Sequence, residues 1–139
     1  MAGLYLVDSS VWVRALRRAG PPGVRRRFEE LLIANQAATC EMVKLELLRA
    51  AANESEFALL EARLQGLHQL STGPGDWLDA ARLGSALRQV GVTVASPDLL
   101  IGAIALRHDA IILHADRDFE LIARHTGLQT ESMLPIADD

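Results

Sequence analysis

Three aspartates stand beside apolar segments, where a carboxylate could do chemistry. Asp8 directly follows the apolar run 4–7, and Asp116 comes shortly after the apolar run 110–113. Asp98 opens a long apolar stretch. Short continuous apolar runs are typical of parallel strands covered on both faces. Right-handed crossovers bring the carboxyl ends of such strands to one edge of the sheet, where sites form. We therefore expect Asp8 and Asp116 along one edge.

A fourth carboxylate, Glu46, lies in a predicted helix with Met42 and Val43 on the same side. Two like charges about 4 Å apart cost roughly 4 kcal/mol at an effective dielectric of about 20. If the four acids converge, they therefore need protons, basic partners or a cation. An all-oxygen ligand set suits Mg²⁺ or Mn²⁺ rather than zinc, and such an ion can assist the hydrolysis of a phosphodiester.

Each acid also has a purely structural interpretation. Asp8 could cap the helix that follows it, and Asp98 could stabilise the positive end of its own helix. Asp116 could form a turn, and Glu46 could pair with Arg49, three residues further on. Spacing alone leaves both interpretations open.

The composition favours one domain over residues 1–139. Half of the 139 residues are apolar, enough for a core, and no run approaches the roughly 18 to 20 apolar residues of a membrane span. The single cysteine, Cys40, fits a reducing cytoplasm, and the amino end has no basic flank typical of a signal peptide. A net charge of −4 argues against non-specific coating of nucleic acid.

Six arginines gather near the amino end. They could form a solvated face, contact a phosphate backbone, or form a binding surface for an acidic partner. They are Arg14, Arg17, Arg18, Arg25, Arg26 and Arg27.

Strands alternate with helices along the chain, which predicts a parallel sheet flanked by helices. The predicted strands are 4–7, 36–40, 66–70, 110–113 and 128–131. The predicted helices are a short one from residue 9 that ends before Gly20, then 24–34, 41–52, 53–65, 76–90, a buried one from Ser96, and one ending at His125.

Side-chain spacing gives more detailed expectations for three of these helices. Ser96 is expected to cap its helix. Leu32 is expected to point inward from 24–34. The predicted helix 76–90 is expected to have one buried stripe, made of Trp77, Ala80, Ala81, Gly84 and Leu87.

Four motifs, in this order, resemble those of PIN-domain ribonucleases, and most closely the VapC toxins of prokaryotic VapBC toxin–antitoxin modules. They are Val-Asp-Ser-Ser-Val-Trp at 7–12, Leu-Glu-Leu-Leu at 45–48, Ser-Pro-Asp-Leu-Leu-Ile at 96–101 and Leu-His-Ala-Asp-Arg-Asp-Phe at 113–119. The resemblance covers nearly the whole chain.

The resemblance implies a role for each acid. Asp8, Glu46, Asp98 and Asp116 would form a catalytic quartet that binds Mg²⁺ or Mn²⁺, with Ser10 and Asp118 in support. One residue beside these positions departs from the family pattern. His114 stands where many relatives have Thr or Ser, and we expect it at the surface end of a strand, without a catalytic role.

The resemblance also implies the fold, the activity and the partners. The fold would be an α/β/α three-layer sandwich around a mainly parallel sheet of four to five strands. The activity would be endonucleolytic cleavage of RNA, often tRNA or rRNA. The partners would be a VapB antitoxin, whose tail covers the active site, and a second copy of the chain in a homodimer.

Two other functions have less support from the sequence. Phosphatases with an aspartate nucleophile usually carry a second Asp two residues after the first, and Ser10 occupies that position here. A non-catalytic module that binds RNA or protein fits the low basicity, but such a module would more typically lack one of the acids. The working hypothesis is a metal-dependent endoribonuclease of the VapC type.

Overall fold

A five-stranded parallel sheet forms the centre of the protein. The computed structural model describes residues 3–134. All neighbouring strands pair in parallel, in the order β3-β2-β1-β4-β5. The strands are β1 (Tyr5–Val7), β2 (Ala37–Thr39), β3 (His68–Gln69), β4 (Ile111–His114) and β5 (Gln129–Ser132).

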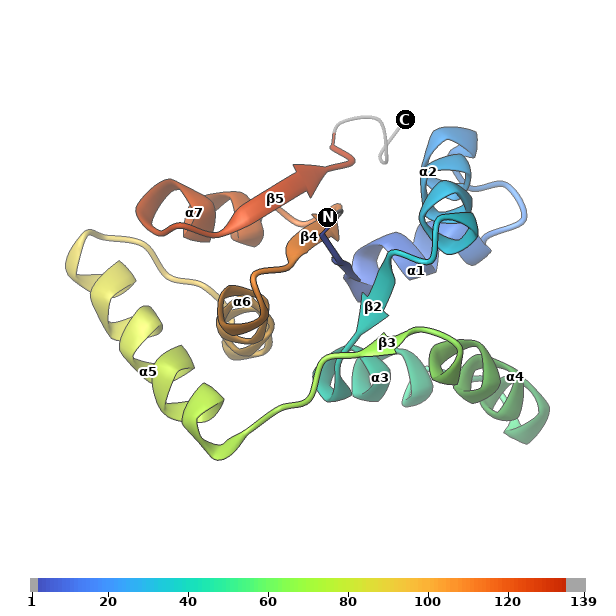
Figure 1. Ribbon diagram of the computed structural model, residues 1–139, viewed down its shortest axis with the longest axis horizontal. Helices are drawn as coiled ribbons and strands as arrows, with labels where there is room; N and C mark the ends of the chain where they lie inside the picture. Colours follow the sequence, from blue (N-terminus) through green and yellow to red (C-terminus); the bar gives the residue numbers. More distant parts are fainter. Residues whose placement is uncertain (1–2, 135–139) are drawn as a thin grey trace.

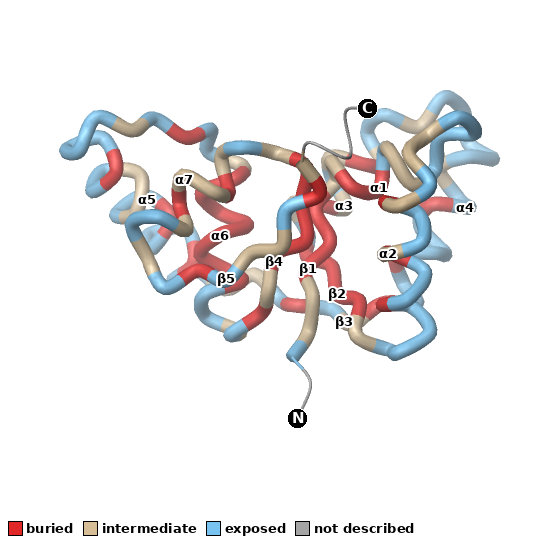
Figure 2. Tube along the Cα trace, turned by 90° about the horizontal axis from the view of Figure 1, so that it is seen from above, coloured by how far each residue is buried: buried red, intermediate tan, exposed pale blue. Residues whose placement is uncertain are grey.

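Helices cover both faces of the sheet (Figure 1). In Figure 2, α5, α6 and α7 lie on one side of the central strand β1, and α1 to α4 lie on the other. The helices in the described range are α1 (Ser9–Leu16), α2 (Pro22–Ile33), α3 (Glu41–Leu48), α4 (Glu54–Gln65), α5 (Pro74–Gln89), α6 (Ser96–His108) and α7 (Arg117–His125). The predicted three-layer α/β/α fold is therefore confirmed.

The helix α6 is the buried helix of the fold. Eight consecutive residues, from Asp98 to Ala105, are buried, as its all-round apolar sequence predicts. Its neighbour α5 approaches closely at Gly84, where a Cβ atom would lie only 2.7 Å from Leu99 Cδ1. This packing fixes the first turn of α6, which carries Asp98, against the rest of the core.

Several predicted boundaries need correction. The predicted helix 41–52 ends at Leu48, because Asn53 starts a new helix by accepting a hydrogen bond from Glu56 N at 2.8 Å. The predicted strand 66–70 shortens to His68–Gln69. The predicted cap at Ser96 is wrong: Ala95 is the N-cap residue and its carbonyl accepts from Asp98 N at 3.1 Å.

Three predicted core side chains face outward. Trp77 is 59% exposed and Ala81 is also exposed, although Ala80 and Leu87 of the same predicted stripe are buried. Trp77 instead lines a shallow depression with Met42 and Leu45. Leu32 is 47% exposed because it lines an apolar pocket between helices. The helical spacing therefore identified the packed side of α5 but overestimated its width.

No helix within residues 3–134 combines the length and the apolar character needed to cross a membrane.

Candidate metal centre

The sheet brings two of the predicted acids to the same edge. β1 and β4 are neighbours in register, with Val7 opposite Leu113. Asp8 follows β1, and its backbone N donates to Leu113 O at 2.9 Å. β4 ends at His114, and only Ala115 separates it from Asp116. Asp8 and Asp116 therefore lie at the adjacent carboxyl ends of β1 and β4, as predicted for a parallel sheet.

Asp8 is held in place by Ser10. Asp8 is 2% exposed, and its Oδ2 accepts hydrogen bonds from Ser10 Oγ at 2.6 Å and from Ser10 N at 3.1 Å. Ser10 Oγ in turn accepts from Ala115 N at 2.9 Å, which ties the two strand ends together. Asp8 Oδ1 is buried and has no hydrogen-bond partner. A buried carboxylate oxygen without a partner is costly unless a proton or a cation satisfies it.

Three aspartates form the tightest acidic group. Oxygen atoms of Asp98, Asp116 and Asp118 lie within 4.8 Å of one another. Asp116 is the N-cap of α7, and its Oδ1 accepts from Asp118 N at 3.0 Å. Asp118 Oδ2 lies 3.4 Å from Ala95 N, at the start of α6. The beginnings of α6 and α7 therefore meet at this group.

The electrostatics of the site are unfavourable without a cation. Burial, followed by hydrogen bonding with and repulsion from Asp116, raises the pKa of Asp98 to about 9. Burial is also the main cause that raises the pKa of Asp8, with Asp116 adding repulsion. Carboxylates that repel one another in a buried place are the arrangement that a divalent cation stabilises.

Glu46 lies at the margin of this group. It is half-buried, and its Oε1 accepts from Ser9 Oγ at 3.2 Å. Burial and repulsion from Asp8 raise the pKa of Glu46, although Ser9 and Arg49 act in the opposite direction. Glu46 is therefore repelled by the other acids of the site, but it does not belong to the group of closest oxygens, which comes from Asp98, Asp116 and Asp118.

The structural interpretation of two acids is compatible with a metal role. Asp8 caps a helix, as the structural interpretation expected, and Asp116, which was expected to form a turn, also caps a helix. Each cap uses one carboxylate oxygen, Asp8 Oδ2 and Asp116 Oδ1, so a second oxygen remains. Capping therefore orients these two carboxylates rather than competing with a metal role.

One expectation about a neighbouring residue needs correction. His114 is fully buried, not at the surface, and its ring contacts Asp116 N and Glu120. Two of the six amino-terminal arginines have partners within the protein: Arg27 pairs with Glu131 at 2.7 Å, and Arg25 donates to Ala15 O at 3.2 Å. The family resemblance implied a supporting role for Asp118, and the structure places this residue in the tightest acidic group. Its position two residues after Asp116 is the signal that could have indicated this.

An open cleft of about 770 Å³ adjoins Asp116 and Asp118. Arg117 and Arg124 also line it, so cationic and anionic side chains share one depression. A phosphate group in the cleft would meet guanidinium groups next to the acidic cluster.

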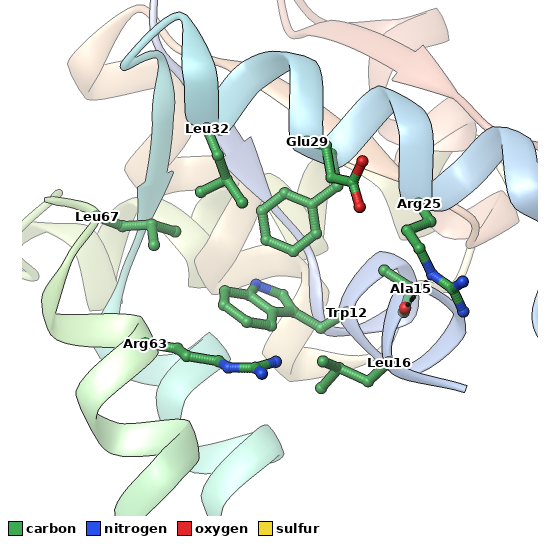
Figure 3. A pocket seen from close by; sticks show the side chains of 9 residues that line it. Trp12, Ala15, Leu16, Arg25, Glu29, Leu32, Arg63 and Leu67 are labelled. Carbon is green, nitrogen blue, oxygen red and sulfur yellow. Dashed lines mark hydrogen bonds between the residues drawn. The ribbon is translucent and has the colours of Figure 1, made fainter. Parts of the chain in front are cut away.

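A separate apolar pocket of about 470 Å³ lies between α1, α2 and α4 (Figure 3). Trp12 and Phe28 form its floor with an edge-to-face contact, their ring centroids 4.7 Å apart. Arg25, Glu29 and Arg63 stand at its margin (Figure 3). Trp12 Nε1 is buried and has no hydrogen-bond partner.

The chain is similar to known proteins over most of its length. The PIN domain family model matches residues 5–125. VapC ribonuclease Mb1587 of Mycobacterium bovis is 39% identical over 134 residues, which cover 93% of this chain and 98% of that protein. Ribonuclease VapC51 of Mycobacterium tuberculosis is 35% identical, with 97% of this chain and 96% of that protein covered.

Solved structures share the fold. VapBC2 from Rickettsia felis, bound to a DNA fragment from its promoter, has a TM-score of 0.76 at 21% identity and covers 93% of this chain and 98% of that one. DNA-bound VapBC from Salmonella typhimurium has a TM-score of 0.77 at 17% identity and covers 94% and 98%. From the family match and the identities above, the chain belongs to the PIN-domain family and, within it, to the VapC ribonucleases.

Proposed function

We propose that this protein is a divalent-metal-dependent endoribonuclease and the toxin of a VapBC-type toxin–antitoxin pair. The observation that carries the proposal is the meeting of Asp98, Asp116 and Asp118 beside the buried, partly unpartnered carboxylate of Asp8. The relatives that are named VapC ribonucleases support the reaction class.

The residues fit a hard divalent cation. All the available donors are carboxylate oxygens, which Mg²⁺ and Mn²⁺ prefer. Asp98, Asp116, Asp118 and Asp8 would hold the ion, with Glu46 at the margin. When bound, such an ion polarises a phosphoryl oxygen and lowers the pKa of a coordinated water. Ser10 keeps Asp8 in a single orientation, because it donates to Asp8 from both its backbone and its hydroxyl.

The cleft beside the acids supports RNA as the substrate. Arg117 and Arg124 line it together with Asp116, so the RNA backbone would be held by guanidinium groups next to the hydrolytic site. The class of RNA, tRNA or rRNA, follows only from the family resemblance and forms part of this proposal.

The apolar pocket supports an antitoxin partner. Solved neighbours with this fold are toxin–antitoxin complexes. Apolar side chains of a VapB segment would fill the space over Trp12 and Phe28, and a backbone carbonyl of that segment would satisfy Trp12 Nε1. Arg25 and Arg63 at the margin would favour acidic residues in the segment.

We also propose that the protein forms a homodimer and acts in the cytoplasm. A homodimer would cover the exposed Trp77 and the neighbouring Leu45, which is 57% exposed. Residues 1–139 would form one domain, and the protein would act in the cytoplasm, where its RNA substrate is found.

The test combines Mn²⁺ calorimetry with RNA cleavage, on wild type and on Asp98→Asn. This nearly isosteric change removes one charge from the site and leaves the packing of α6 intact. We expect the wild type to bind Mn²⁺ and to cleave RNA until EDTA is added, and the variant to lose both properties. Full cleavage by the variant, with contaminating nuclease excluded, would contradict the proposal that this acidic site catalyses RNA cleavage. A wild type that neither binds Mn²⁺ nor cleaves RNA in its presence would favour a module that only binds RNA or protein.

A further inference from the structure

His114, at the end of β4, is a fully buried imidazole that the proposed function does not use. Its Nδ1 lies 3.1 Å from the backbone N of Asp116, and its Nε2 lies 2.8 Å from Glu120 Oε1. The ring also lies beside Phe119, with the two ring centroids 5.3 Å apart. The two ring nitrogens and the ring itself therefore contact α7 and the turn that precedes it.

The two contacts determine which ring nitrogen carries the proton. A backbone N–H can only donate, so Nδ1 is the acceptor of the bond from Asp116. The proton of the neutral ring then lies on Nε2 and is donated to Glu120. Because both nitrogens are occupied, neither is available to take a proton from water. The contacts of His114 therefore suit a positioning role and not that of a general base.

Glu120 is itself held from a second direction. Thr130 Oγ1, on β5, donates to the same Oε1 atom at 2.8 Å. Burial alone would raise the pKa of Glu120, but the hydrogen bonds from Thr130 and His114 outweigh it and lower the pKa overall. The ionised carboxylate of Glu120 therefore links β4, α7 and β5, and it anchors the imidazole.

The anchored imidazole acts on the backbone of a predicted metal ligand. Asp116 starts α7, and its own carboxylate accepts from Asp118 N at 3.0 Å. A hydrogen bond to Asp116 N thus restrains the turn from which both carboxylates project. Oxygens of these two residues lie within 4.8 Å of an oxygen of Asp98, a spacing that a rotated turn would not keep.

We propose that His114 is a positioning residue of the metal centre: supported by Glu120, it holds the backbone of Asp116 so that Asp116 and Asp118 face Asp98. This role rests on the proposed function, because the orientation of these carboxylates matters only if they bind the ion. Groups that orient metal ligands typically change metal affinity by about 10- to 100-fold when they are removed.

Two substitutions at one position separate the two contacts. In His114→Asn, the side-chain oxygen replaces Nδ1 as the acceptor for Asp116 N, while the contact with Glu120 is lost. In His114→Gln, the longer amide replaces the Nε2 donor to Glu120, and Asp116 N loses its acceptor. His125→Gln makes the same chemical change at the exposed end of α7 and is the matched control. Glu120→Ala removes the support alone and serves as the second test if His114→Gln does not fold.

Two measurements are made on each folded variant. The first is hydrogen exchange of the Asp116 amide in metal-free protein, which reports the restraint without any ion. The second is the Mn²⁺ dissociation constant by calorimetry. We expect His114→Gln to speed the exchange and to weaken Mn²⁺ binding about tenfold or more, whereas His114→Asn stays within about threefold of wild type. Glu120→Ala should fall between them, and His125→Gln should match wild type.

Each contrary result has a distinct meaning. Equal Mn²⁺ affinity in wild type and His114→Gln would overturn the positioning role, even if the variant melts at a lower temperature, since a general loss of stability predicts that pattern. Equal weakening in His114→Asn and His114→Gln would overturn the role of the Asp116 contact. A wild type that binds no Mn²⁺ would overturn the proposed metal centre itself, and the amide exchange would then show whether His114 restrains Asp116 for a structural reason alone.

Discussion

Two buried aspartates occupy the same helical position and have opposite surroundings. Asp76 is the third residue of α5 and Asp98 is the third residue of α6, and they are 1% and 7% exposed. Arg107 donates to both carboxylate oxygens of Asp76, at 2.7 and 2.9 Å, and this pairing lowers the pKa of Asp76. Asp98 has other carboxylates as neighbours, and its pKa is raised to about 9.

The difference shows how one local sequence pattern serves two purposes. Both aspartates follow a proline in the first helical turn, where an acid interacts favourably with the helix dipole. Tertiary contacts then decide the surroundings: Arg107 pairs with the carboxylate of Asp76, whereas Asp98 lies among other carboxylates, an arrangement that indicates a candidate functional site. The helix α6 contributes to both, because it carries Asp98 in its first turn and Arg107 in its last.

The largest expected effect comes from changing Asp98 to asparagine. Asp98→Asn should reduce RNA cleavage by at least about 100-fold, a loss typical of removing one preorganised electrostatic group. The metal-free variant should melt at a higher temperature than metal-free wild type at neutral pH, because folding no longer confines a carboxylate that repels its neighbours.

Asp76→Asn is the matched control and should behave in the opposite way. Its amide would place N–H donors against Arg107 and Gly73 N, which now donate to the carboxylate. We expect the melting temperature to fall by about 5 °C or more, while the folded variant binds Mn²⁺ with unchanged affinity. A lower melting temperature in Asp98→Asn, together with a stable Asp76→Asn, would contradict the comparison. Circular dichroism and calorimetry measure both properties.

A second, smaller contrast tests how far the acidic site extends. Asp118 belongs to the tightest group of oxygens, whereas Glu46 is half-buried at its margin. Asp118→Asn should therefore weaken Mn²⁺ binding about tenfold and Glu46→Gln only about threefold, because electrostatic interaction weakens with distance. Calorimetry on both variants measures this order. The reverse order would make Glu46 a direct ligand, as the family resemblance implies, and Asp118 its support.

The smallest expected effect is a difference in the pH dependence of stability. Between its unfolded pKa of 3.8 and about 9, Asp98 binds more protons in the folded protein than in the unfolded one. The free energy of unfolding of metal-free protein should therefore fall as pH rises through this window. The pKa of Asp76 is lowered by folding, so its contribution is present above 3.8 and is lost as pH falls through the lowered value.

Melting temperatures of metal-free wild type and the two asparagine variants, from about pH 2 to about pH 9, check these signs. Asp98→Asn should flatten the decline toward high pH and leave the acidic side unchanged. Added Mn²⁺ should stabilise the wild type more at high pH than at low pH, because binding displaces protons from the cluster. Stabilisation by Mn²⁺ that does not change with pH would argue against Asp98 as a ligand.

Much of the fold could be predicted because the signals are local. Apolar runs gave the central strands β1 and β4, and the strand–helix alternation predicted the parallel sheet. Asp8 and Asp116 follow those strands, so their shared edge was also predictable. The burial of Asp98 follows from the apolar sequence around it.

The misjudged features depend on contacts between distant segments. His114 can be buried because Glu120 on α7 accepts a hydrogen bond from its Nε2, and Thr130 on β5 donates a hydrogen bond to Glu120 in turn. Trp77 is exposed because only part of the apolar face of α5 packs against α6. No periodicity in one segment reports how wide a neighbouring surface is, or which group will approach from another strand.

The place of β1 has a consequence for synthesis on the ribosome. β1 is made before β4, yet the two strands are neighbours in the sheet, with Tyr5 opposite Ile111. A growing chain therefore carries Asp8 long before Asp116 exists, and such non-local pairings form late and slowly. Because β4 and the start of α7 must emerge before the acids can meet, an incompletely translated chain lacks the acidic centre that we propose cleaves RNA.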